Sequence, residues 1–564
     1  MEIHGVKPLL LQGVGAIIAV FVMRFLYSGY QSRMRVRSLK AQDIPILPHS
    51  LLFGHLPIFA DFRAAHPPDV NIYVFHTWLS KNYKKYFPHL GRLPPVIYVD
   101  LWPVMDGLAL VYDAVAASQF TQVTSLPKFN AAREFMAPLT ANLDLVSTEG
   151  DIWKKWRSRF SPGFSPRNML AMLPELLEEA LVFVDCLKDL AGKDGKWGPV
   201  FKLEEKTTNL TFDIIARAAL DVRFHEQTSK TGGPLKVAMM KQIRLMSTMA
   251  NAARLSPIGK MPWHHVAIIR NNRTMRGVLV PQIENRLRLG SNNIQRKTIV
   301  DLAIKYVDND DPHAYREKPD SEFINMLIAN LKAFMLAGHD TTASTICFMT
   351  KLLYDNPECL AKLRAEHDMV LGPEPDKAID ILTRSPHILY SLPYTLGVIK
   401  ETLRLYPLAA SMRVAPAGFC LMARGSSTRY PMDGFALWVS APGIQRNPDY
   451  WPRPDDFLPQ RWVVAESDPL YASKEAWAPF SLGPRNCIGM ELAMVELRLV
   501  SVLITRTFDI EEAWEDWDKR QGLKATTSHI VDGERLYCVG DGTVHPKDGM
   551  PVHVRLRPCQ PVAQ

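Results

Sequence analysis

The sequence lacks the cysteine patterns that build disulfide frameworks and zinc fingers. Its 564 residues include seven cysteines, an odd number with no Cys-x-x-Cys pair, which disfavours both kinds of site. No Gly-x-Gly-x-x-Gly turn or P-loop occurs in a strand–helix context, so we expect no fused flavin or nicotinamide module. Internal repeats and low-complexity tracts are absent. With 47% hydrophobic residues, the chain is expected to fold around a substantial core.

Positive charge is scarce on the part of the chain that is expected to form the folded body. The net charge is +8, but residues 1–42 hold six basic residues against one acidic residue, which leaves only +3 for the other 522. A nucleic-acid-binding protein concentrates its positive charge on its folded domain. We therefore expect no nucleic-acid partner.

The sequence has one long apolar run, from Pro8 to Tyr27. As a helix its 20 residues would span ~30 Å, the thickness of a bilayer hydrocarbon core. The basic cluster follows this run, which by the positive-inside rule holds the rest of the chain in the cytosol. The alternatives are a cleaved signal, which would carry its charge first, or a surface helix with one apolar face. We expect residues 1–42 to form a retained single-span membrane anchor.

The rest of the chain predicts a mostly α-helical protein with a smaller β portion, an α+β fold. We expect a proline-containing connector at residues 43–57 and one large domain at residues 58–564. The expected elements are strands at Pro95–Trp102 and Gly107–Asp113, a helix through Leu170–Val184, a loop at Asp308–Asp320, a helix of ~50 Å at Ser321–Tyr354, a helix at Ile488–Thr505, and short strands within Thr526–Leu556.

One cysteine lies in a glycine-flanked turn before an amphipathic helix, in the segment Phe480-Ser-Leu-Gly483-Pro-Arg485-Asn-Cys487-Ile-Gly489. The helix N-terminus and free backbone N–H groups favour a thiolate, so we expect the pKa of Cys487 to be lowered. The glycines let the backbone approach a large flat group, and Arg485 offers a fork for a carboxylate. Such a thiolate can serve as the axial ligand of haem iron. The alternative is a buried structural cysteine.

This segment resembles the haem-binding signature of the cytochrome P450 family, and every signature position matches. Four further segments resemble motifs of that family in the same chain order: Trp153-Lys-Lys-Trp-Arg157, Ala337-Gly338-His339-Asp340-Thr341-Thr342, Glu401-Thr-Leu-Arg404 and Phe457-Leu-Pro459-Gln-Arg461-Trp462. The resemblance covers essentially the whole chain and is nearest to fungal microsomal members of secondary metabolism. It implies the P450 fold, a single large haem domain behind one transmembrane helix, with haem as cofactor and Cys487 as the iron ligand.

The segment around Asp340 resembles the oxygen-activation motif of the family. Within a helix, paired threonines are indifferent helix formers and a buried acid is costly. We expect Gly338 to leave space beside the helix, and Asp340 and Thr341 to distort it and to deliver protons to bound dioxygen. The alternative is a surface turn of a long helix. His339 is not expected to bind a metal, because no HExxH pattern or partner histidine accompanies it.

Glu401 and Arg404 are neighbours on one helix face. An isolated pair of this kind is usually a solvated contact. With Arg461 as a third member, the resemblance implies a buried hydrogen-bonded network behind the cysteine loop. The family often has Glu and Phe where this chain has Gln460 and Trp462, and we expect this departure to leave the network untouched.

Four side chains are candidates to hold the haem propionates by N–H and charge-assisted hydrogen bonds: Trp153, Arg157, Arg413 and Arg485. For Arg413 the ground is only its place in an expected strand after Tyr406-Pro407, and an ordinary exposed arginine is the alternative. On the Trp153 helix, Lys154, Lys155 and Arg159 form either a solvated face or part of a basic docking surface for an acidic redox partner.

The resemblance implies a monooxygenase that inserts one oxygen atom from O₂ into a lipophilic organic substrate. Electrons would come from an NADPH-dependent reductase in the same membrane, the endoplasmic reticulum, with the catalytic domain in the cytosol. Two alternatives stay open: the same fold acting as a desaturase, isomerase or dehydratase, and a membrane-tethered binding protein with a structural cysteine. Substrate contacts are expected from Phe120–Asp144, Leu235–Trp263, Leu408–Met412 and the tail hairpin near Asp541.

Overall fold

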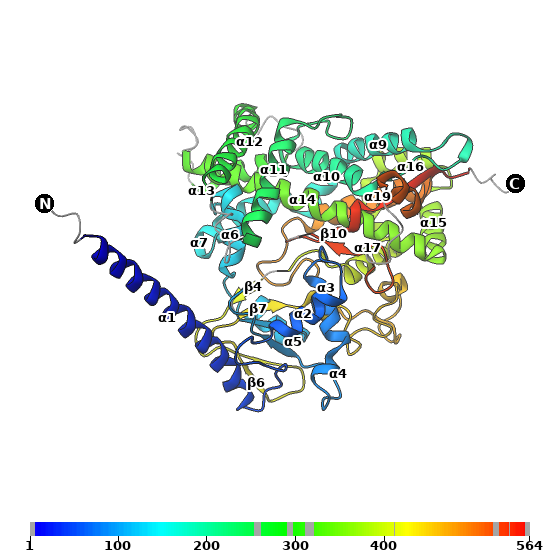
Figure 1. Ribbon diagram of the computed structural model, residues 1–564. Helices are drawn as coiled ribbons and strands as arrows, with labels where there is room; N and C mark the ends of the chain where they lie inside the picture. The colour runs from blue at the N-terminus through cyan, green and yellow to red at the C-terminus, as the bar shows by residue number, and fades with distance from the viewer. Residues whose placement is uncertain are drawn as a thin grey trace.

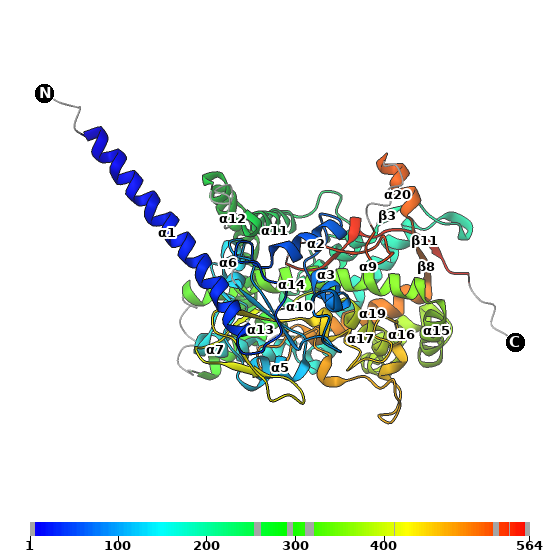
Figure 2. The same ribbon diagram turned by 60° about the horizontal axis from the view of Figure 1, so that its bottom comes forward.

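Helices form most of the body, and the short strands lie partly in a smaller region beside them and partly among the helices (Figure 1). The computed structural model describes residues 6–105, 107–252, 261–289, 297–310, 321–410, 412–522, 530–540 and 542–558. One long N-terminal helix, α1 (Val6–Lys40), projects away from this body in both views (Figures 1 and 2). The predicted mostly α-helical architecture with a smaller β portion is confirmed.

The described α-helices after α1 follow one another along the whole chain. They are α2 (Leu56–Ala65), α3 (Tyr73–Lys81), α4 (Tyr83–Tyr86), α5 (Ala114–Ser118), α6 (Asn130–Thr140), α7 (Gly150–Phe160), α8 (Pro166–Ala171), α9 (Leu173–Leu190), α10 (Leu203–Leu220), α11 (Pro234–Ala252), α12 (Pro262–Leu289), α13 (Ile299–Asp310), α14 (Ser321–Asp355), α15 (Pro357–Leu371), α16 (Pro375–Arg384), α17 (Pro393–Leu405), α18 (Ala441–Ile444), α19 (Met490–Thr507) and α20 (Trp514–Gln521).

The strands of the described residues are short and form four small sheets. They are β1 (Val96–Val99), β2 (Leu108–Val111), β3 (Phe201–Lys202), β4 (Met412–Val414), β5 (Cys420–Met422), β6 (Arg429–Pro431), β7 (Ala436–Val439), β8 (Phe508–Glu512), β9 (Cys538–Val539), β10 (His545–Pro546) and β11 (Pro551–Leu556). The largest sheet has the order β1-β2-β7-β4, with β2 parallel to β7 and the other pairs antiparallel. The strands predicted near Pro95 and Gly107 are therefore confirmed as its first two members.

The centre of the body is α14, a helix of 35 residues and therefore ~52 Å in length. Most of its side chains from Met326 to Leu353 are buried, and it packs along α10. Asn356 and Pro357 follow its last residue, where a new helix starts with proline in its first turn. The predicted long helix from Ser321 is confirmed, with its end one residue later than expected.

Two predicted boundaries were wrong. The apolar periodicity from Leu170 to Val184 belongs to two helices, because α8 ends at Ala171 and α9 starts anew with a proline in its first turn. The loop expected from Asp308 does not include residues 308–310, because α13 continues through Asp310. Residues 311–320 of that loop lie outside the described part of the chain. Short strands within the predicted tail are present as β9, β10 and β11.

The base of α1 is held to the body through Asp100, which follows β1. Arg33 forms an ion pair with Asp100 at 2.5 Å, and the two side chains are 4% and 0% exposed. Ser32 donates a hydrogen bond to Asp100 at 2.8 Å, and His49 lies 3.1 Å from its other oxygen. Burial raises the pKa of Asp100, but the hydrogen bonds from His49, Arg33 and Ser32 outweigh it and hold the pKa well below its usual range. The last turns of α1 are thus packed into the body, with Val36 fully buried.

Asp100→Asn is expected to destabilise the protein by ~3–5 kcal/mol, because it leaves the buried charge of Arg33 uncompensated. Chemical denaturation measures the free energy of unfolding. Since the folded pKa is lowered, this stabilisation is present above pH ~4 and is lost as the pH falls below that value. Asp61→Asn is the matched control, because Asp61 pairs with Lys85 at an exposed site and should change stability by at most ~1 kcal/mol. Equal effects of the two variants would contradict this interpretation.

Candidate active site

The cysteine loop is a tight turn that ends where α19 begins. The Cys487 backbone N–H donates to the Phe480 carbonyl at 2.8 Å, and the Asn486 N–H donates to the Gly483 carbonyl at 3.1 Å. Gly483 has a φ of +79°, and a Cβ at this position would lie 2.2 Å from the Thr121 carbonyl oxygen. Only glycine fits both conditions. Gly489 stands at the N-cap of α19, so the loop and the helix start are one continuous unit.

The Cys487 side chain is exposed, yet protein surrounds it closely enough to change its ionisation. Burial raises the pKa of the thiol, and the Gly489 N–H and the Arg157 charge only partly oppose this effect. The expectation that the helix N-terminus lowers the pKa of Cys487 was therefore wrong for the free thiol, because desolvation is the larger contribution. An exposed sulfur in desolvating surroundings faces an interior space rather than open solvent.

The middle of α14 also faces an interior space. Ala337 is exposed and Leu336, Gly338 and Thr341 are half-buried, although most side chains of this helix from Met326 to Leu353 are buried. The Thr341 hydroxyl donates to the Ala337 carbonyl at 2.8 Å. Two expectations were wrong here: α14 runs without interruption past Asp340 and Thr341, and the space beside Gly338 is filled by Ile215 of α10, 3.1 Å from where a Cβ would stand.

Arg413 lies in β4 and is 1% exposed, so the alternative of an ordinary exposed arginine is wrong. Its Nε and Nη1 atoms have no hydrogen-bond partner among the described residues. Burial lowers the pKa of Arg413 to about 10, and the charge of Arg485 adds to this effect. A buried guanidinium without a partner is costly. This position therefore suits an anionic group.

Two other candidate cations near this position already have protein partners. Arg485 binds the Glu149 carboxylate at 2.7 Å and the Thr148 carbonyl at 3.0 Å, and its guanidinium lies 4.4 Å from the Trp153 ring centre. Arg157 donates to the Asn486 carbonyl and to the Asn486 side-chain oxygen, both at 2.8 Å. These contacts connect α7 to the cysteine loop and place two guanidinium groups beside it.

Sequence reasoning missed Lys128, which forms an isolated β-bridge with Arg413. Burial lowers the pKa of Lys128 to about 7, and the charges of Arg485 and Arg413 lower it further. The accumulation of positive charge beside the cysteine loop requires anionic compensation. A lysine between Pro127 and Phe129, within a segment assigned to substrate contacts, was the only indication in the sequence.

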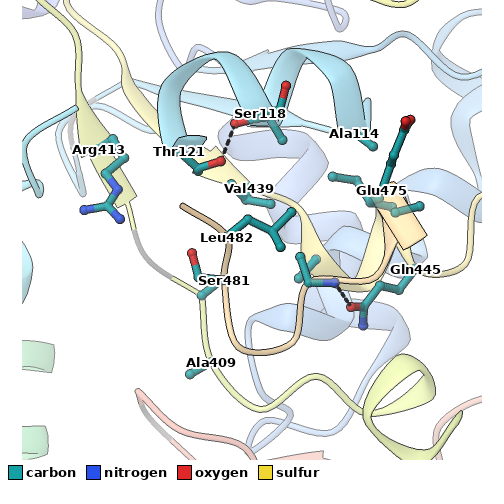
Figure 3. Close-up of a pocket in the computed structure, with 16 residues that line it drawn as sticks. Ala114, Ser118, Thr121, Ala409, Arg413, Val439, Gln445, Glu475, Ser481 and Leu482 are labelled. Carbon is teal, nitrogen blue, oxygen red and sulfur yellow. Dashed lines mark hydrogen bonds between the residues drawn. The ribbon is translucent and has the colours of Figure 1, made fainter. Parts of the chain in front are cut away.

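A pocket of about 600 Å³, including its opening to solvent, connects β4 with the cysteine loop. Figure 3 shows Arg413 on one side of this pocket, Gln445 and Glu475 on the other, and Ser481 and Leu482 between them. The remaining lining is mostly alanine and aliphatic. Cys487 itself does not line this pocket. Its accessible thiol and the unpaired buried guanidinium of Arg413 are groups that suit haem, which carries two carboxylates and an iron that binds sulfur.

Glu401 lies at the centre of a buried network behind the cysteine loop. Arg404 reaches its two carboxylate oxygens at 2.8 and 2.9 Å, and Arg461 reaches one of them at 3.1 Å. The side chains of Glu401, Arg404 and Arg461 are 0% exposed. The Trp462 indole N–H donates to Glu401 at 3.0 Å. The network is intact, as expected despite Gln460 and Trp462, and the Trp462 indole adds a hydrogen bond to it.

The basic residues of α7 divide into two groups. Lys154 and Lys155 are exposed, as a solvated or docking face requires. Arg159 is buried, 5.1 Å from the Trp156 ring centre, and so does not belong to that face. Of the expected substrate segments, residues 253–260, 411 and 541 lie outside the described part of the chain.

An accessible Cys487 thiol on a tight loop fits the class of haem-thiolate proteins, in which a cysteine thiolate ligates haem iron. A sequence model of the cytochrome P450 family matches residues 70–529. The chain is 35% identical to cytochrome P450 monooxygenase polC of Polytolypa hystricis over 96% of its length and 95% of that protein. It is 30% identical to cytochrome P450 monooxygenase acrF of Aspergillus aculeatus over 86% of its length and 98% of that protein. The chain belongs to the cytochrome P450 family.

A solved structure supports the fold. The crystal structure of the cytochrome P450DA heme domain superposes with a TM-score of 0.66 at 21% identity, covering 91% of this chain and 97% of that chain. The predictions of family, fold and enzyme class are confirmed: the chain is a cytochrome P450 monooxygenase. Proteins of this family bind haem through a cysteine thiolate and use O₂, a small-molecule substrate and a redox partner. One N-terminal helix is long and apolar enough to cross a membrane.

Proposed function

We propose that this P450 inserts one oxygen atom from O₂ into a lipophilic organic substrate of secondary metabolism, and that Cys487 supplies the thiolate ligand of its haem. The observation that carries the assignment is the accessible Cys487 thiol together with the unpaired buried guanidinium of Arg413, which lines a pocket that Ser481 and Leu482 of the cysteine loop also line. Haem, when bound, supplies the activation of O₂. The protein holds the group, excludes water and provides protons.

Arg413 and Arg157 are the first candidates to hold the propionates, and Trp153 and Arg485 complete that set. Arg413 has two free donor atoms, whereas Arg485 would share its charge with Glu149. Charge-assisted hydrogen bonds of this kind are short and directional, so they fix the orientation of the group. Phe480, Gly483 and Gly489 shape the loop that presents Cys487, and Gly483 does so by its left-handed backbone conformation.

Thr341 and Asp340 are the proposed proton-delivering pair. The Thr341 hydroxyl proton is directed at the Ala337 carbonyl, which leaves the lone pairs of the oxygen free to accept a hydrogen bond from the interior space. Asp340 is 8% exposed, and its carboxylate is close to the partly exposed side chain of His545, which solvent reaches. General acid catalysis requires a group that supplies the proton and a group that positions its delivery. The Asp340 carboxyl would supply the proton, and the Thr341 hydroxyl would orient its delivery.

Thr341→Ala is expected to uncouple the enzyme, because the hydroxyl that orients proton delivery is lost. Product formed per NADPH consumed should fall ~10- to 100-fold, and released hydrogen peroxide should rise to account for the electrons. Thr350→Ala is the matched control, since Thr350 bonds the Ile346 carbonyl in the same helix at 2.8 Å. Unchanged coupling in Thr341→Ala, or equal loss in both variants, would contradict the assigned role.

We further propose that α1 anchors the protein in the endoplasmic reticulum membrane with the catalytic domain in the cytosol, and that an NADPH-dependent reductase supplies electrons. The apolar surface of α1, with Ile17 and Phe21 exposed, supports an apolar environment for this helix. The exposed Lys154 and Lys155 on α7, close to the cysteine loop through Arg157, support a basic docking face. The division of the chain into a membrane anchor (residues 1–42), a connector (residues 43–57) and a catalytic domain (residues 58–564) stays a prediction.

The test starts from metabolite profiling of a strain that lacks the protein. The metabolite that accumulates is incubated with the purified full-length protein, reductase and NADPH under ¹⁸O₂. A product that carries one labelled oxygen supports the proposal. A product that has lost two hydrogens and gained no label would identify a desaturase, and conversion without NADPH would identify an isomerase or dehydratase.

A further inference from the structure

Asp340 is connected through its carboxylate to three residues from other parts of the chain. The Thr543 hydroxyl donates to the Asp340 carboxylate, and His545 Nε2 lies 3.2 Å from the Thr543 oxygen and 3.5 Å from Asp340 Oδ2. The other ring nitrogen, Nδ1, lies 2.7 Å from Glu204 Oε1. A continuous hydrogen-bonded chain thus connects Asp340 with Glu204 at the start of α10.

The hairpin that carries Thr543 and His545 is fixed in place over α14. The buried amide of Asn71 donates to the Gly540 carbonyl at 2.8 Å, and the Val544 N–H donates to the Leu408 carbonyl at 3.1 Å. Gly540 has a φ of +95°, and a Cβ there would lie 2.7 Å from the His545 ring. Glycine at this position therefore gives the imidazole the room it occupies.

The surroundings of His545 favour its protonated form. Burial lowers the pKa of His545, but the hydrogen bond to Glu204 and the charge of Asp340 outweigh it and raise the pKa to about 9. The neighbouring His339 on α14 is buried, and burial lowers its pKa. Lys547 on the same hairpin is paired with Asp69 and does not compete for these carboxylates. At neutral pH the imidazolium lies between two acidic side chains.

We propose that His545 is a positioning residue that returns protons to Asp340 through the Thr543 hydroxyl during turnover. This inference rests on the proposed role of Asp340. When Asp340 has given up its proton, the Thr543 O–H proton moves to Asp340 Oδ2, and the Nε2–H proton of the imidazolium moves to the Thr543 oxygen. The imidazole is then neutral with Nδ1–H on Glu204, and it regains a proton at Nε2 from water. Its side chain is 30% exposed, which gives water access.

The test compares His545→Gln with the wild-type protein as full-length haem-loaded enzyme. Glutamine keeps a hydrogen-bonding amide but has no titratable proton. With purified NADPH–P450 reductase and no added substrate, O₂ consumption by the wild type should decline as the pH rises through about 9. In His545→Gln it should be ~10-fold slower below that pH and show no such decline. His553→Gln is the matched control, because His553 bonds Asp516 away from this chain of residues, and it should follow the wild-type profile.

A second measurement follows the protonation of His545 without turnover. Because the folded pKa is raised above the ordinary value of ~6.5, the stabilisation by His545 is complete below that pH and is lost as the pH rises through about 9. The difference in melting temperature between wild type and His545→Gln should therefore be largest near pH 6 and disappear above pH 9. Glu204→Gln should move the wild-type decline in O₂ consumption to lower pH.

The outcomes separate this inference from the proposed function. A pH-dependent melting difference together with an unchanged O₂ profile in His545→Gln would make His545 merely structural and overturn the inference. Absence of both effects would overturn it as well. A wild-type protein whose reduced carbon monoxide complex lacks a thiolate spectrum would instead contradict the proposed function.

Discussion

Cys487→Ala is expected to lower O₂ consumption driven by NADPH and the reductase at least ~100-fold below the wild type, because the variant lacks the proposed thiolate ligand of haem. The red-shifted band of the reduced carbon monoxide complex should disappear with it. The exposed side chain contributes little packing, so the variant should still fold. An oxygen electrode and a haem assay on the purified full-length proteins measure these effects.

Cys420→Ala provides the matched control for this loss. Cys420 lies in β5, where its thiol contacts the Gly418 carbonyl at 3.8 Å, away from the cysteine loop. This variant should keep both the spectrum and the O₂ consumption. If Cys487→Ala retained the wild-type spectrum, Cys487 would be a structural cysteine and the assignment of the ligand would fail.

Glu401→Gln is expected to lower the free energy of unfolding by ~3–5 kcal/mol and to reduce the yield of haem-loaded protein. The substitution removes the negative charge between two buried guanidinium groups, Arg404 and Arg461, and leaves both without compensation. It also exchanges an acceptor for an amide donor beside the Trp462 indole N–H. Chemical denaturation and the haem-to-protein ratio measure the two effects.

The same change at an exposed pair shows what burial contributes. Glu374, the residue before α16, pairs with Lys377 in the first turn of that helix at 2.7 Å, and their side chains are 53% and 66% exposed. Glu374→Gln should change stability by at most ~1 kcal/mol. If both variants lost a similar free energy of unfolding, the buried network would contribute no more to stability than a surface contact does.

The local parts of the fold and site could be predicted from the sequence. The long helix from Ser321 has an apolar pattern and a proline after its end, so its bounds follow from neighbouring residues. The cysteine loop is defined within ten residues, where glycines and Cys487 stand at fixed spacing. Such features depend on short-range chemistry, which a single sequence contains.

Contacts between residues far apart in the chain could not be predicted from local sequence patterns. Thr543 lies 203 residues from Asp340, and His545 lies 341 residues from Glu204, so only the folded chain brings them together. The raised pKa of Cys487 has the same origin. Its cause is desolvation by surrounding protein, whereas the helix N-terminus, which the sequence does show, has the smaller effect.

The buried state of Arg413 also depends on tertiary structure. Its short strand pairs with β7, whose partner β2 comes from a distant part of the chain. The sequence around an isolated three-residue strand contains no pattern that separates a buried guanidinium from an exposed one. The folded structure makes this distinction, because it leaves two donor atoms of Arg413 buried and unpaired among the described residues.

The absorption spectrum of the wild-type, full-length protein, reduced and exposed to carbon monoxide, tests the central claim most directly. We expect a strongly red-shifted Soret band, which is the signature of haem iron that would be held by the Cys487 thiolate. A band at the position typical of nitrogen ligation in freshly prepared protein, or protein without haem after haem-replete expression, would contradict the account.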